Sequence, residues 1–158
     1  MQIGKFTFNW GSRTYVMGIL NVTPDSFSGD GLITNADVIQ SATLQASGML
    51  DSGADILDIG GESTRPGSAP VNADEELERV IPVIHSIHKN LPDALISIDT
   101  YKSQVAEEAI KSGAHIVNDV WGLRADSNLA NIVARYETSV ILMHNRSNPA
   151  SVEVREKL

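Results

Sequence analysis

The chain has 158 residues, of which 42% are hydrophobic and 20% charged, a composition ordinary for one globular domain. Its net charge is −8 and it has no cluster of Lys and Arg, which argues against a nucleic-acid partner. It has no cysteine and no apolar run of about 18 residues, so we expect no disulfide, no membrane span and a cytoplasmic location.

Strand-like and helix-like periods alternate along the chain. Residues 5–9 and 13–16 flank Trp10-Gly11-Ser12 and predict an N-terminal β-hairpin. Buried strands, each apolar on both faces, are expected at 16–20, 54–61, 94–100, 115–120 and 138–145. Helices are expected from about Asn35 to Gly53 and at 73–90, 102–114 and 126–136. Pro82 should kink the second of these helices or end its first segment.

Five strands separated by four helices predict a parallel α/β sheet. Polar residues gather where the strands end, at Asn21, Gly60-Gly61-Glu62, Asp99-Thr100, Asn118-Asp119 and His144-Asn145. An α/β barrel has its active site at that edge, and a doubly wound sheet has it at its switch point. No glycine-rich dinucleotide or P-loop fingerprint follows any strand, which weakens a nucleotide-binding interpretation.

The length indicates part of a larger fold. A (β/α)8 barrel typically needs about 250 residues, and this sequence supplies five strands. We therefore expect residues 1–158 to form one barrel domain that is incomplete at its C-terminus, with about the first five βα units and the hairpin.

Two long motifs carry a specific resemblance. MGILNVTPDSF (17–27) and ILDIGGESTRPG (56–67) resemble the two signature segments of the dihydropteroate synthase family. ISIDTYKSQVAEEAI (96–110) and IVNDV (116–120) are similar to further blocks of that family, in the same order. One departure is that Gly29 stands where the family usually has an acidic residue. The resemblance implies a (β/α)8 transferase of folate biosynthesis, which condenses 6-hydroxymethyl-7,8-dihydropterin pyrophosphate with 4-aminobenzoate to 7,8-dihydropteroate and pyrophosphate.

Asp99 and Asn118 are the candidate catalytic and pterin-binding residues. A carboxylate at a strand end can accept the N–H donors of the pterin's amino-pyrimidine edge, and Asn118 offers both a donor and an acceptor. The alternative for Asp99 is to cap the helix that starts near Lys102. Met143 could pack on the pterin face or simply fill the core. The alternatives for Asp58 are support of the pterin network and a buried structural role. Asp119 is expected to be a loop residue or to support the residues that contact the ligand.

The resemblance also implies Mg²⁺, because loss of pyrophosphate develops negative charge. Asn21 is the candidate ligand, the alternative being an ordinary turn asparagine. His85 and His88 are expected to be surface residues, not a metal pair. In the two motif loops, the candidates for the aminobenzoate and pyrophosphate sites are Asp25, Ser26, Phe27, Thr64, Arg65 and Pro66, the alternative being plain loop chemistry.

Two other functions are compatible with the sequence. One is a methyltetrahydrofolate-dependent methyltransferase-like domain, and the other is a pterin-binding fragment without catalysis. The family also uses an acidic residue, a Lys and an Arg-x-His pair from the second half of the barrel, which these residues do not include. We therefore expect the chain alone to be inactive and the full-length enzyme to be a homodimer.

Overall fold

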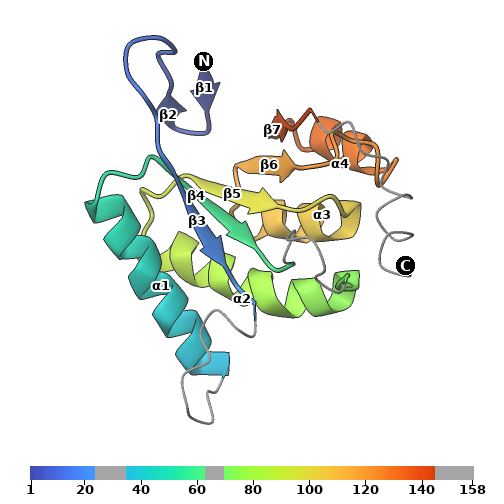
Figure 1. The fold of residues 1–158 in the computed structure, drawn as a ribbon, viewed down its shortest axis with the longest axis horizontal. Helices are drawn as coiled ribbons and strands as arrows, with labels where there is room; N and C mark the ends of the chain where they lie inside the picture. Colours follow the sequence, from blue (N-terminus) through green and yellow to red (C-terminus); the bar gives the residue numbers. More distant parts are fainter. Residues whose placement is uncertain (24–34, 63–69, 145–158) are drawn as a thin grey trace, which may run out of the picture.

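Five parallel strands form one sheet in the computed structural model, which describes residues 1–23, 35–62 and 70–144 (Figure 1). The strands are β3 (Met17–Asn21), β4 (Ile56–Gly60), β5 (Ile96–Asp99), β6 (Ile116–Asp119) and β7 (Ser139–Leu142). Their order in the sheet is the order of the chain, β3-β4-β5-β6-β7. A doubly wound sheet would reverse direction at a switch point, whereas consecutive βα units of a barrel run in this order. The predicted α/β class and the five βα-type strands are confirmed.

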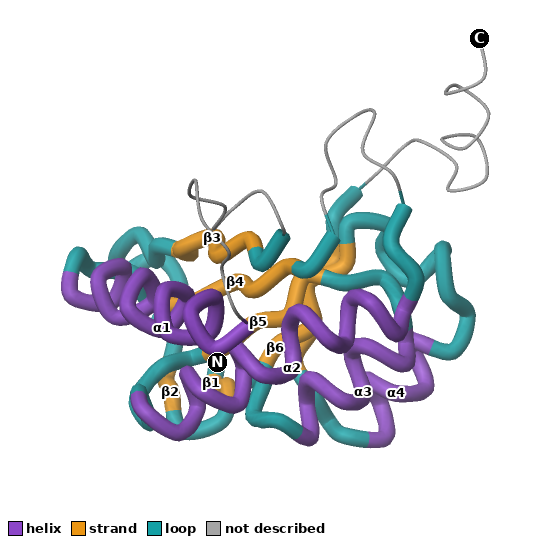
Figure 2. Tube along the Cα trace, turned by 90° about the horizontal axis from the view of Figure 1, so that it is seen from below, coloured by secondary structure: helices purple, strands orange, loops and turns teal. Residues whose placement is uncertain are grey.

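Four helices connect these strands and lie together on one side of the sheet (Figures 1 and 2). They are α1 (Asn35–Asp51), α2 (Ala73–Asn90), α3 (Ser103–Lys111) and α4 (Leu129–Arg135). Every other strand residue points to them: Leu20, Ile59, Ile98 and Val117 pair across the sheet and belong to the main core. That alternation turns the remaining strand residues to the opposite face.

Helix α2 begins at a well-formed cap and runs through Pro82. The side chain of Asn72 accepts a hydrogen bond from Glu75 N at 2.9 Å, and acidic residues fill the first turn. The alternative that Pro82 ends the first segment of the helix is wrong, since α2 continues to Asn90. Val83, Ile84 and Ile87 are fully buried after the proline, and this packing offsets the backbone hydrogen bond that Pro82 does not make.

The N-terminal hairpin exists, but its predicted strands are wrong. Its strands are β1 (Gln2–Ile3) and β2 (Phe6–Thr7), joined by a tight turn in which Gly4 has a φ of 57°. A glycine adopts this left-handed conformation at little cost, so the chain reverses here and not at Trp10-Gly11-Ser12. Ile3 and Phe8 pack against Ile56, Leu95 and Ile116 at the amino ends of the parallel strands. The hairpin therefore covers the edge of the sheet opposite to the carboxyl ends.

The remaining strands and helices lie where the sequence predicts them, with shorter ends. Strand β4 starts at Ile56, which pairs with Met17, and just before it the carboxylate of Asp55 accepts hydrogen bonds from Arg13 and from Val16 N. In the part of the chain that the structure describes, no helix is both long and apolar enough to cross a membrane.

Replacing Leu57 by alanine tests the outer core. Leu57 is 0% exposed and lies between β3 and β5, so Leu57→Ala should lower the free energy of unfolding by about 2–5 kcal/mol. Leu44 on α1 is 67% exposed, and Leu44→Ala should change it by less than about 0.5 kcal/mol. Urea denaturation followed by circular dichroism measures both. Equal losses in the two variants would contradict the assigned core.

Candidate functional site

Four residues form one row across the carboxyl ends of adjacent strands. Asn21 pairs with Gly60, Gly60 with Asp99, and Asp99 with Asn118. Residues paired in parallel register project to the same face of a sheet, and here it is the face away from the helices. The predicted pterin residues Asp99 and Asn118 and the predicted magnesium ligand Asn21 are thus brought together.

Gly60 leaves a gap in this row. A Cβ atom built on Gly60 would lie 3.6 Å from Asp99 Oδ2 and 3.8 Å from Asn21 Oδ1. These are ordinary contact distances, so any larger residue would fill the space between the two polar side chains. The missing side chain keeps Asp99 and Asn21 open to a ligand.

Asp99 is partly buried, and among the described residues no hydrogen bond to its carboxylate is found. Burial raises its pKa to about 7, and the negative charges of Asp58, Glu76, Asp119 and Glu62 add to the rise. A carboxylate in such a place lacks the partners that normally compensate for lost hydration. Its free acceptor sites suit a ligand with N–H donors.

Asp99 does not cap helix α3. Lys102 N donates to Thr100 Oγ1 at 3.2 Å, and Ser103 N donates to Asp126 Oδ2 at 2.7 Å. The capping alternative for Asp99 is therefore wrong, because neighbouring side chains take up the first amides of the helix.

Asp58 orients Asn118 from beneath the row. Asn118 Nδ2 donates to Asp58 Oδ2 at 2.9 Å, and Asp58 is only 2% exposed. Burial raises the pKa of Asp58, and the hydrogen bond from Asn118 partly opposes that rise. The other oxygen of Asp58 has no hydrogen-bond partner among the described residues. Asp58 is thus buried and also bonded to Asn118. The two alternatives for Asp58, a buried structural role and support of the residues in the row, therefore do not exclude each other.

Asn21 ends β3 with an exposed side chain. Within residues 1–23, 35–62 and 70–144, no three His, Cys, Asp or Glu side chains are grouped so that they could hold a metal ion. His85 and His88 are both exposed on α2, as predicted. The only chemistry that this row offers Mg²⁺ is therefore amide and carboxylate oxygen, which is the kind of ligand that the ion prefers.

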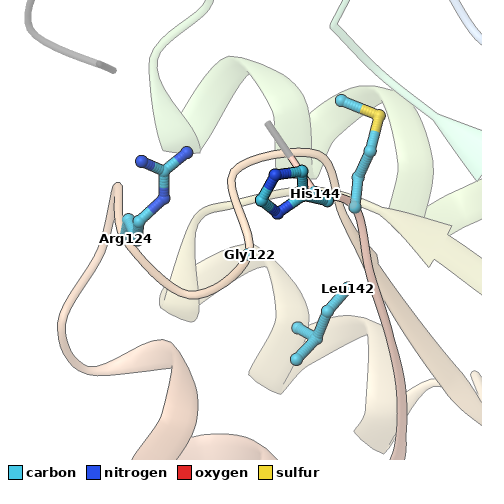
Figure 3. Close-up of a pocket in the computed structure, with 5 residues that line it drawn as sticks. Gly122, Arg124, Leu142 and His144 are labelled. Carbon is cyan, nitrogen blue, oxygen red and sulfur yellow. The ribbon is translucent and has the colours of Figure 1, made fainter. Parts of the chain in front are cut away.

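Met143 lies just beyond β7 and is 47% exposed, so it is not packed in the core that the described residues form. Together with Gly122, Arg124, Leu142 and His144 it lines an open hollow, with Arg124 and His144 reaching it from the loops after β6 and β7 (Figure 3). The expectation that Asp119 is a loop residue is wrong, since it ends β6 and is fully buried. Its carboxylate accepts hydrogen bonds from Trp121 N at 2.8 Å and Leu123 N at 2.6 Å and so fixes the loop that follows the strand.

One group of side chains was not predicted. Lys102 Nζ forms ion pairs with both Glu62 and Glu76 close to the row. The signal in the sequence is Glu76, which precedes Val80 by one helical turn and so interrupts the apolar stripe of α2 with an acid.

Several predicted residues lie outside the described part of the chain. They are Asp25, Ser26, Phe27, Thr64, Arg65 and Pro66, and with them Asn145 and the helix expected near the C-terminus.

Comparison with known proteins identifies the family. Residues 17–158 match the model of the pterin binding enzyme family. The dihydropteroate synthase of Clostridium beijerinckii is 51% identical over 148 residues, which cover 94% of this chain and 54% of the relative.

Solved structures agree with this match. A crystal structure of dihydropteroate synthase from Clostridium difficile, determined in the presence of pteroic acid, superposes with a TM-score of 0.81 at 50% identity and covers 95% of this chain and 57% of that one. The Xanthomonas albilineans enzyme with 4-aminobenzoic acid gives a TM-score of 0.77 at 41% identity, covering 92% and 53%. These similarities confirm the resemblance and the partial barrel predicted from the sequence. The chain spans about half the length of the relatives it matches, and it belongs to the pterin-binding enzyme family as a homologue of the dihydropteroate synthases.

Proposed function

We propose that these residues form the pterin-binding half of a dihydropteroate synthase, which joins 6-hydroxymethyl-7,8-dihydropterin pyrophosphate to 4-aminobenzoate. The observation that carries the proposal is Asp99, a partly buried carboxylate without a hydrogen bond from the described residues, beside Asn118 in one row. Such a pair meets the donors and acceptors along the edge of an amino-pyrimidine ring. The relatives reported above favour this reaction over methyl transfer.

The reaction breaks one bond, forms another and develops positive charge on the pterin between these two events. The C–O bond between the pterin's methylene carbon and pyrophosphate breaks, and the leaving group takes the electron pair. The amine nitrogen of 4-aminobenzoate then bonds to that carbon and loses a proton. Positive charge develops on the pterin in between, and the Asp99 carboxylate is positioned to stabilise it. Asn118, held by Asp58, keeps the ring in register with Asp99.

Mg²⁺ fits the exposed end of the row. Mg²⁺ keeps several waters and commonly takes one or two protein oxygens together with substrate phosphates. Asn21 Oδ1 is such an oxygen, and the gap at Gly60 separates it from Asp99. Bound there, the ion would neutralise charge on the departing pyrophosphate. The cytoplasmic location, the absence of a nucleic-acid partner and the homodimer of the full-length enzyme stay predictions.

A second function applies to the 158 residues on their own, namely pterin binding without turnover. It is favoured because the chain spans about half of its relatives. Titration calorimetry with the pterin pyrophosphate, together with an assay for pyrophosphate release, separates the two. Release by these residues alone would exclude the binding-only function.

Asp99→Asn should lower turnover of the full-length protein by about 100-fold or more, since the isosteric amide no longer carries the charge that stabilises the pterin. Its thermal midpoint should stay the same or rise, because a charge whose burial opposes folding is removed. Steady-state kinetics and a thermal melt measure both. Asp51→Asn, at the exposed end of α1, is the control and should leave both unchanged. Near-normal turnover in Asp99→Asn would contradict the assignment.

Binding of 6-hydroxymethyl-7,8-dihydropterin, which has no pyrophosphate to titrate, should strengthen as the pH rises from 6 to 7 and level off above. The pKa of Asp99 is about 7 in the free protein, so below pH 7 the carboxyl is protonated and must lose its proton to accept ligand donors. The limiting gain is about tenfold per pH unit. Calorimetry at several pH values measures it. An equal pH slope in Asp99→Asn would refute the role of this carboxyl.

Asn21→Ala should reduce the enhancement that Mg²⁺ gives to binding of the pterin pyrophosphate by about tenfold, because one oxygen ligand is lost. Affinities measured by calorimetry with and without Mg²⁺ give this enhancement directly. Asn131→Ala on the exposed surface of α4 is the matched control. If Mg²⁺ still strengthens binding of the pterin pyrophosphate to the same extent in Asn21→Ala, other residues hold the ion.

A further inference from the structure

Lys102 joins three elements at the carboxyl edge of the sheet. It precedes α3, and its Nζ binds Glu62, which follows β4, and Glu76, which lies in the first turn of α2. The side chain of Glu76 is 1% exposed, and those of Lys102 and Glu62 are 15% and 13% exposed. One cation is therefore shared by two largely buried carboxylates.

Neighbouring groups fix the same stretch of backbone after β4. Tyr101 Oη donates to Glu62 Oε1 at 3.2 Å, and Lys102 Nζ lies 4.5 Å from the centre of the Tyr101 ring. From the other side, Arg79 Nη1 donates to the carbonyl oxygen of Gly61 at 2.8 Å. The exit of β4 is thus bound by side chains from α2 and from the segment between β5 and α3.

Gly61 shows how closely this exit is packed. A Cβ atom on Gly61 would lie 2.7 Å from Val80 Cγ1 and 2.9 Å from Glu76 Cγ, closer than real side chains approach. The backbone rests directly on α2, and Glu76 both touches it and binds Lys102. Glu76 thus links Lys102 to the backbone at Gly61 through an ion pair and close packing.

Stability alone is a weak reason for this arrangement. Removing two carboxylates and an ammonium from water costs more than well-packed apolar side chains of similar volume would. The buried charges instead fix one geometry, at a point where Gly60 belongs to the row and Asp99 precedes Lys102 by three residues. Asp99 itself is positioned by the pairing of β5 with β4 and β6, which does not require Lys102.

We propose that Lys102 is a positioning residue that sets the path of the chain from Gly60 to Glu62 and thereby serves the amine substrate more than the pterin. The inference rests on the proposed function and on the family resemblance, which implies that the aminobenzoate site is bordered by residues that follow Glu62 in the sequence. The pterin contacts stand on β5 and β6 and depend on strand pairing. Lys102 touches no reacting atom.

Lys102→Met tests the proposal, because it keeps the length of the side chain and removes its charge. In the full-length protein it should raise the KM for 4-aminobenzoate about tenfold or more, as misplacement of a binding segment does. At about pH 9, where the Asp99 carboxyl is ionised in both proteins, the KM for the pterin pyrophosphate should change less than about threefold, since its contacts are elsewhere. Lys102→Arg, which retains the charge, should recover most of the loss. A purely structural role would change both KM values together.

Hydrogen exchange of the amides from Gly60 to Glu62 gives a second measurement that needs no activity. It should accelerate in Lys102→Met, with β5 and β6 unchanged. Lys111→Met is the matched control, because Lys111 pairs with Glu107 and Glu108 on the exposed side of α3. If Lys102→Met does not fold, Glu62→Gln replaces it, since this variant keeps the pair of Lys102 with buried Glu76.

Equal changes in both KM values, or unchanged exchange at Gly60 to Glu62, would overturn the proposal. If the wild-type protein neither binds nor turns over the substrates, the proposed function fails. Hydrogen exchange alone then decides whether Lys102 positions this segment.

Discussion

The parallel register of the sheet is the constraint on which the site depends. Leu20, Ile59 and Ile98 must face the helices, because the core is built from them. Since successive residues of a strand point to opposite faces, Asn21, Gly60 and Asp99 must then point the other way. A slip of one residue in any strand would bury a polar side chain of the row under a helix. The register that packs the core therefore also aligns the polar residues of the row.

Electrostatics then determines what this row can bind. The acids Asp58, Asp99 and Asp119 lie at the carboxyl edge, and of the described cations near them Lys102 is already shared by two glutamates. Such a site favours a ligand edge rich in N–H donors and disfavours an anion. A pterin pyrophosphate has one end of each kind. Its anionic end must meet a cation, which places Mg²⁺ at the Asn21 end of the row in the proposed function.

The sequence predicts those parts of the molecule that depend on local patterns. The polar residues at the strand ends allowed us to predict that Asn21, Asp99 and Asn118 lie side by side. Periodicity and chain order are enough to align parallel strands. The hairpin was placed wrongly because Gly4 could form a turn as well as Trp10-Gly11-Ser12, and only packing decides between them. Lys102 was missed for a different reason. Its partners Glu62 and Glu76 lie 40 and 26 residues away, and no periodicity links them.

The face that carries the row also carries apolar side chains. Ile19 pairs with Asp58 and is 51% exposed, while Ile141 pairs with Asn118 and is 38% exposed, so both point to that face. They stand on the two outermost strands, β3 and β7, with the polar acceptors between them. A pterin has hydrogen-bonding edges and apolar faces, and it needs both kinds of contact. In the proposed function, Asp99 and Asn118 meet the edge of the pterin, and the same face of the sheet carries the apolar side chains of Ile19 and Ile141.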